Sequence, residues 1–190
     1  MILSRTVGSF LRLKYKFFNK RPAVNICEQL AKTNSVLIFM PTKVEQFGAA
    51  LRSLESLRKL RPKWKITVVT KLEMVSFIDS KLKVDILPYS KEDQNFAGVP
   101  KSAIKQLVRN TNYDLALDFK IKFDLLSVML FELSGAPIKV CFDSPEKSPF
   151  YNFEIRVNPA ESLPNKYNAM IKYITAMVSS ETPQKTLPQT

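Results

Sequence analysis

Five short apolar runs alternate with helical segments between residues 35 and 142, and this alternation constrains the fold more than any other feature. The runs read VLIFM at 36–40, KITVVT at 65–70, VDILPY at 84–89, DLALDF at 114–119 and IKVCF at 138–142. Continuous apolar runs of this length are typical of parallel strands that are covered on both faces. Strands separated by helices indicate βαβ units with right-handed crossovers. We therefore predict an α/β fold, a single doubly wound, Rossmann-like domain with a mainly parallel sheet and helices on both faces.

The segments between and after these runs carry helical signals. Apolar residues recur at three- and four-residue spacing over 44–60, which predicts a helix with one buried stripe that ends before Pro62. Further helices are expected over 72–79, from Pro100 in a first turn to about 110, over 123–133 with Gly135 as the C-cap, and over 163–178. A short edge strand is expected at 153–157.

Length and composition set the domain boundaries. A chain of 190 residues favours one domain with tails. We expect a basic amphipathic segment at 1–34, the Rossmann-like domain at 35–178, and a disordered tail at 179–190, because that last stretch is polar and contains prolines.

The charge and the missing residue types limit the function. The formal net charge of +12 indicates an anionic partner such as nucleic acid, anionic lipid or a phosphorylated molecule. The chain has no histidine, so histidine-dependent catalysis and imidazole metal ligands are excluded. Its two cysteines, Cys27 and Cys141, lack the spacing of a zinc site or a disulfide framework. We predict no metal ion and no cofactor. We expect a cytoplasmic protein, with contact to the inner face of a membrane left open, since no run approaches the roughly 20 apolar residues of a spanning helix.

The N-terminal stretch mixes basic and aromatic residues and has no Asp or Glu before Glu28. Three interpretations stay open: a helix that packs on the domain, a helix that lies on an anionic membrane, and an organellar transit peptide. The candidate contact residues for a membrane or a partner are Arg12, Lys14, Lys16, Phe17 and Phe18.

Two blocks of this sequence resemble glycosyltransferase family 9, the heptosyltransferases of lipopolysaccharide assembly. The first block reads VLIFMPTKVEQFGAALRSLESLRKLRPKWKITVVT, and the second reads NYDLALDFKIKFDLLSVMLFELSGAPIKVCFDSPEKSPFYNFEI. The resemblance covers residues 36–178 and is most specific in the second block. It implies the acceptor-facing N-terminal half of a two-domain GT-B enzyme. The donor-binding half has no counterpart here, so we expect a degenerate single domain.

The turn after the first run departs from that family. Family members carry Gly-Asp there, and their aspartate is the proposed base. The alignment places Glu45 and Gln46 at these positions, and a glutamine cannot accept the proton. Glu45 is one position early, which turns it about 100° away on a helix. We therefore predict no catalytic residue. Weak anion binding at the helix start by Thr42 and Lys43 is one interpretation, and an ordinary helix start is the other.

Polar residues also follow two later runs. Doubly wound sheets bind ligands at the carboxyl ends of their strands. Candidates for binding an acceptor are therefore Asp118, Lys120, Asp143 and Ser144. The structural alternative is that Asp118 caps a loop or the following helix.

Three hypotheses for the function remain. The leading one is a glycosyltransferase-like protein that is not catalytic by itself and acts as a binding or scaffold subunit toward an anionic partner, a membrane surface or a larger assembly. The first alternative is the acceptor-binding half of a split GT-B enzyme, in which a separate chain brings the nucleotide-sugar. The second is a sequence-independent nucleic-acid binder, which the charge favours and no motif supports.

Overall fold

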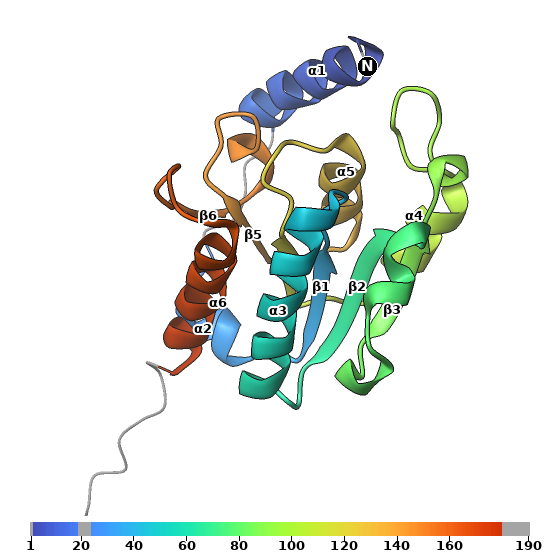
Figure 1. Ribbon diagram of the computed structural model, residues 1–190. Helices are drawn as coiled ribbons and strands as arrows, with labels where there is room; N and C mark the ends of the chain where they lie inside the picture. Colours follow the sequence, from blue (N-terminus) through green and yellow to red (C-terminus); the bar gives the residue numbers. More distant parts are fainter. Residues whose placement is uncertain (1, 19–23, 180–190) are drawn as a thin grey trace, which may run out of the picture.

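A single parallel sheet forms the centre of the protein, whose computed structural model describes residues 2–18 and 24–179. Within these residues the sheet has six strands in the order β3-β2-β1-β4-β5-β6 (Figure 1). The strands are β1 Ser35–Phe39, β2 Lys65–Lys71, β3 Asp85–Tyr89, β4 Leu115–Asp118, β5 Ile138–Phe142 and β6 Phe153–Ile155. Every neighbouring pair is parallel. The order reverses between β1 and β4, so the predicted doubly wound fold is confirmed.

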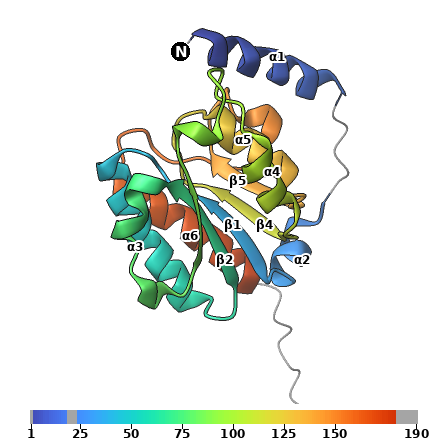
Figure 2. The same cartoon turned by 90° about the vertical axis from the view of Figure 1, so that its right-hand side faces the viewer.

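Helices cover both faces of this sheet. The α-helices are α1 Ile2–Phe18, α2 Ile26–Ala31, α3 Val44–Leu60, α4 Ser102–Arg109, α5 Leu125–Leu133 and α6 Leu163–Ser179. Short 3-10 helices are η1 Leu72–Phe77, η2 Ser80–Leu82, η3 Lys91–Asp93 and η4 Ser148–Phe150. Helices α3 and α6, with α2, lie on one face, whereas α4 and α5 lie on the other (Figure 2).

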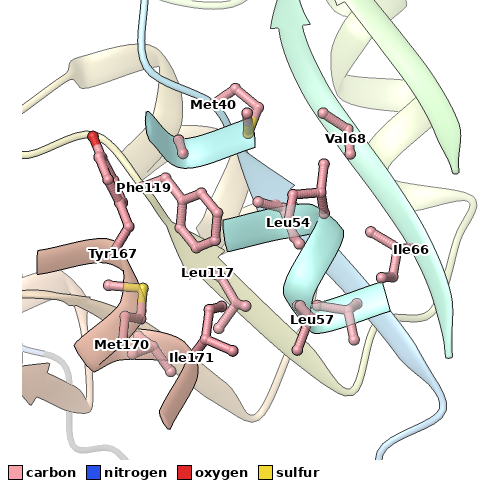
Figure 3. Close-up of a cluster of buried hydrophobic side chains, with 14 of the residues drawn as sticks. Met40, Leu54, Leu57, Ile66, Val68, Leu117, Phe119, Tyr167, Met170 and Ile171 are labelled. Atoms are coloured by element: carbon pink, nitrogen blue, oxygen red, sulfur yellow. The ribbon is translucent and has the colours of Figure 1, made fainter. Parts of the chain in front are cut away.

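Each face has its own buried core because side chains alternate across the strands. On the α3 and α6 side, Leu54 and Leu57 of α3 meet Leu117 of β4 (Figure 3). Met170 and Ile171 of α6 close the same cluster from the other side. On the opposite face, residues of α4 and α5 pack on the alternate strand positions. Burial on both faces therefore explains the apolar runs of β1, β4 and β5. The expectation is wrong for the run at 84–89, because β3 is an edge strand in which only Tyr89 is buried.

Helix α1 lies outside these two layers, at the end of the molecule formed by the carboxyl ends of the strands (Figures 1 and 2). It contacts η4, which follows β5. Leu11 and Tyr15 pack against the core on the α4 and α5 face. The N-terminal segment thus covers part of the edge at which doubly wound sheets bind ligands.

Several local features differ from the sequence predictions or fall outside the described residues. Helix α2 was not expected from the sequence. The short helix expected over 72–79 is a 3-10 helix over residues 72–77. Pro100 is not in the first turn of α4, because Lys101 is the N-cap and Pro100 bridges to Gln94. The tail expected to be disordered lies almost wholly outside the described residues, as does the stretch 19–23.

Candidate functional site

A buried ion pair lies at the carboxyl end of β4. The Nζ of Lys147 is 2.9 Å from Oδ2 of Asp118, and the two side chains are 0% and 1% exposed. The hydroxyl of Tyr151 donates to the same carboxylate oxygen at 2.7 Å. The backbone N–H of Lys120 donates to Oδ1 at 3.0 Å. Lys147 also donates to the backbone carbonyl of Lys120. Three donors therefore surround the Asp118 carboxylate.

A second buried cation continues this network toward β3 and α5. The Nζ of Lys120 is 3.1 Å from Oδ1 of Asp124 and donates to the hydroxyl of Tyr89 at 3.2 Å. It also lies 5.3 Å from the centroid of the Tyr89 ring, a cation–π distance. Asp124 is the N-cap of α5 and accepts hydrogen bonds from the backbone N–H and the hydroxyl of Ser127, both at 2.9 Å. We call Asp118, Lys120, Lys147, Tyr151, Tyr89 and Asp124 the strand-end network.

The charges of the strand-end network stabilise one another. Burial alone would lower the pKa of Lys120, but Asp124, Tyr89 and Asp118 outweigh it and hold that pKa above its ordinary value. Burial would raise the pKa of Asp124, yet Lys120 and the hydrogen bonds from Ser127 bring it below its ordinary value. Burial and the Asp118 carboxylate raise the pKa of Tyr151 well above the usual value for a phenol. At neutral pH Lys120 and Asp124 are therefore both charged, and the Tyr151 phenol is neutral. The backbone N–H and carbonyl of Lys120 link this pair to Asp118 and Lys147.

This arrangement limits the chemistry that Asp118 can do. A general base must reach the proton of a bound substrate, directly or through one water. Both oxygens of the Asp118 carboxylate already accept hydrogen bonds, and the side chain is 1% exposed. The network instead ties the segment after β5, which supplies Lys147 and Tyr151, to the end of β4.

The turn between β1 and α3 presents a helix start at the same edge. Lys43 is the N-cap of α3 and its exposed side chain makes no capping hydrogen bond. Thr42 and Gln46 are half-buried, and Glu45 is exposed in the first turn. The positive end of the helix dipole therefore lies beside a lysine, an arrangement that attracts anions. Anion binding at this turn stays a prediction.

Asp143 and Ser144 follow β5 and take part in separate contacts. The carboxylate of Asp143 is 2.9 Å from Nε of Arg156, whose side chain is 89% exposed. The carbonyl of Ser144 accepts the backbone N–H groups of Lys147 and Ser148 at 2.8 and 3.0 Å. This turn places Lys147 beneath the loop, so Ser144 positions a member of the strand-end network.

The predicted contact residues of the N-terminal segment lie on α1. The guanidinium of Arg12 is 5.9 Å from the centroid of the Phe123 ring. Lys14 is exposed, and Phe17 is 68% exposed. The side chains of Lys16 and Phe18 lie outside the described part of the structure.

Comparison with known proteins places the chain in a family. Residues 12–177 match the model of the family described as a family of unknown function, DUF6913. The chain belongs to this family. No curated protein matches the DUF6913 sequence.

Solved heptosyltransferases share the fold of this DUF6913 domain. E. coli heptosyltransferase WaaC with ADP matches with a TM-score of 0.56 and 15% identity, over 73% of this chain and 46% of that chain. A glycosyl transferase of family 9 from Veillonella parvula matches with a TM-score of 0.55 and 16% identity, over 76% and 41%. E. coli ADP-heptose lps heptosyltransferase II matches with a TM-score of 0.55 and 18% identity, over 82% and 44%. The chain thus spans less than half of each structure. The resemblance expected from the sequence is confirmed for the fold.

Sequence reasoning missed most members of the strand-end network. The sequence analysis predicts no role for Lys147, Tyr89 or Tyr151. One signal was available, because Asp118 interrupts an apolar run and a buried carboxylate requires a cationic partner. The identity of that partner was not readable, since Lys147 lies 29 positions away in the sequence.

The described residues of this domain contain neither a group of metal ligands nor a helix that could span a membrane. In residues 2–18 and 24–179 no three His, Cys, Asp or Glu side chains are grouped to hold a metal ion. Helices in the same part of the chain lack the length and apolar character needed to cross a membrane.

Proposed function

We propose that this protein is a glycosyltransferase-like domain that does not transfer sugar by itself and acts as a binding or scaffold subunit toward an anionic partner. The observation that carries the proposal is the closed strand-end network. At the edge where a doubly wound sheet binds ligands, Asp118 is 1% exposed and paired with Lys147. A substrate would have to displace these contacts and leave buried charges without partners.

The turn after β1 supports the same conclusion from a different residue. Gln46 occupies the position that the resemblance assigns to the catalytic aspartate of glycosyltransferase family 9. An amide has no useful basicity at neutral pH, so it cannot activate an acceptor hydroxyl. Glu45 is exposed on the first turn of α3, one helical position away.

The charge of the protein supports the binding part of the proposal. Its formal net charge is +12, and a surface of this sign raises the local concentration of anionic partners. A protein that has kept the fold without the reaction can still present such a surface.

Sugar transfer is the direct test. The purified protein is incubated with ADP-heptose and a lipopolysaccharide-type lipid acceptor, and the products are analysed by mass spectrometry beside an active heptosyltransferase as the positive control. We expect no glycosylated acceptor and no donor consumption above the level without protein. Turnover by this chain alone would overturn the proposal. Transfer that appears only after addition of a co-purifying second polypeptide would support the split enzyme instead.

A further inference from the structure

Helix α1 has one side that is anchored to the domain. The ring centroids of Tyr15 and Phe150 are 4.9 Å apart. Gly8 is buried against Phe123, and a Cβ at this position would lie 3.0 Å from Cε1 of that ring. Leu11 packs on the same core. The helix is therefore held in one rotational orientation.

The opposite side of α1 exposes large apolar side chains. Phe10, Leu13 and Phe17 are 68%, 58% and 68% exposed. They follow one another at three- and four-residue spacing, which places them on one face of the helix. Together with Lys14 they line one shallow surface hollow. We call Phe10, Leu13 and Phe17 the outer face of α1. A contiguous apolar patch on an otherwise charged protein is typical of an interaction site.

The sequence stretch that carries the outer face is rich in basic residues and has no acidic residue. No Asp or Glu occurs in residues 1–27, whereas this stretch contains six Lys and Arg residues: Arg5, Arg12, Lys14, Lys16, Lys20 and Arg21. Exposed Lys14 borders the apolar hollow on one side. Arg12 and Leu13 line a second hollow that continues toward the loop before η4. Lys14 thus places a positive charge beside the apolar residues, in a stretch that carries no negative one.

Another exposed aromatic residue belongs to a loop near α1. The loop between η3 and α4 reaches the end where α1 lies in both views (Figures 1 and 2). This loop carries Phe96, which is 87% exposed. The side-chain oxygen of Asn95 accepts the N–H groups of Ala97 and Val99, both at 3.0 Å, and so fixes the turn beneath Phe96.

We propose that the outer face of α1 binds the surface of an anionic lipid bilayer, with Phe10, Leu13 and Phe17 inserted between headgroups and Lys14 beside the lipid phosphates. This inference depends on the proposed function in one respect, because it identifies the anionic partner of that proposal as a membrane. A helix of 17 residues is about 25 Å long and can lie in the interface plane. Because α1 is already folded and docked, binding carries no cost for forming the helix.

A lipid surface fits this face better than other anionic partners. Nucleic acid would explain the positive charge, but it does not require an aliphatic side chain such as Leu13 between two phenylalanines. A protein partner would cover the apolar residues, but it gives no reason for the acid-free stretch. Insertion of apolar groups together with attraction to anionic headgroups requires both features.

Vesicle binding tests the proposal. The purified protein is sedimented with vesicles of phosphatidylcholine alone or of phosphatidylcholine mixed with phosphatidylglycerol. We expect binding to the mixed vesicles and little binding to the neutral ones. The variant Phe10→Ser, Leu13→Ser, Phe17→Ser should bind at least about tenfold more weakly, because it removes three apolar groups from the interface. Lys14→Gln should weaken binding about fivefold.

Matched control variants distinguish binding by this face from nonspecific binding of the protein to vesicles. The control variant replaces three exposed apolar residues elsewhere, Leu60, Leu107 and Tyr173, by serine, and it should bind like wild type. Lys59→Gln, on α3, controls for the loss of one positive charge. Phe96→Ser should weaken binding less than the triple variant does. Thermal unfolding midpoints should nearly agree between the triple variant and wild type, since all three side chains are more than half exposed.

Several outcomes would overturn the proposal. Equal binding to neutral and anionic vesicles would show that the anionic headgroups are not recognised. Binding of the triple variant at the wild-type level would show that the outer face of α1 is not the contact surface. Absence of vesicle binding together with salt-sensitive binding to RNA would assign the surface to nucleic acid. Sugar transfer is measured on the same preparation. If the protein neither binds vesicles nor transfers sugar, only this inference is overturned. If it binds vesicles and also transfers sugar, only the proposed function is overturned.

Discussion

Replacing Lys147 by methionine tests whether the strand-end network is a closed structural element. Its Nζ lies 2.9 Å from the Asp118 carboxylate, and neither side chain is exposed by more than 1%. Methionine keeps most of the length of the side chain and removes the charge. Asp118 then stays buried with only the Tyr151 hydroxyl and the Lys120 N–H as donors.

The cost follows from the loss of one partner of a buried pair. Such losses destabilise proteins by about 3–5 kcal/mol. The two remaining hydrogen bonds to Asp118 favour the lower end, about 3 kcal/mol, and the lost bond to the Lys120 carbonyl adds about 1 kcal/mol. We expect Lys147→Met to lower the free energy of unfolding by about 4 kcal/mol. Asp118→Asn combined with Lys147→Met removes both charges and should cost only about 1–2 kcal/mol.

Urea unfolding followed by far-UV circular dichroism measures these differences. With an m-value of about 2 kcal/mol/M, the midpoint of Lys147→Met should fall by about 2 M. Arg156→Met is the control, because the pair of Arg156 with Asp143 is largely exposed and should contribute less than about 1 kcal/mol. A loss below about 1 kcal/mol for Lys147→Met would refute the reasoning. It would mean that the ammonium group is hydrated and that the edge is open to ligands.

Two further predictions concern Lys120 and the packing of α1 on the domain. Lys120→Met should destabilise the protein most near neutral pH. The pKa of Asp124 is lowered in the fold, so its ion pair with Lys120 contributes fully to stability above the ordinary carboxyl pKa of about 4. That contribution is lost as pH falls through the folded pKa of Asp124. The difference in unfolding free energy between variant and wild type should therefore shrink in acid, and a difference that grows there would contradict the ion pair. Gly8→Leu should push the Phe123 ring away and release α1, because even a Cβ would lie 3.0 Å from that ring. Hydrogen exchange of the α1 amides should accelerate, whereas Lys14→Leu on the exposed side should leave their exchange unchanged.

Most strands and helix α3 could be predicted from the sequence because their burial pattern is local. Strand β5 has the bounds expected from the run IKVCF, and α3 has the bounds expected from its apolar stripe. Helix α2 was missed because six residues show less than two turns of periodicity. Pro100 was assigned to a helix start on its general preference, but here the chain first closes a bridge to Gln94.

The site was only partly readable because its partners are distant in sequence. The position of Asp118 and Lys120 at the carboxyl edge followed from the predicted strand. Their contacts did not, since Tyr89 lies 31 positions before Lys120 and Lys147 lies 29 positions after Asp118. No periodic pattern encodes such pairings. The exposed apolar side of α1 could not be predicted from the sequence either. The helix has two apolar sides, and only its packing on the domain decides which of them is covered.

Two neighbouring strand ends now give independent reasons for the loss of catalysis in the proposed function. In the parallel register Phe39 of β1 lies beside Asp118 of β4, so the turn after β1 and the strand-end network flank the point where the sheet order reverses. The turn carries Gln46 where a base is required, and the network has already paired the nearest carboxylate. Restoring a carboxylate at one of these ends would leave the other unchanged. Under this proposal the ion pairs hold the loops in place, while α1, which lies over the same edge, leaves its apolar side free for a partner.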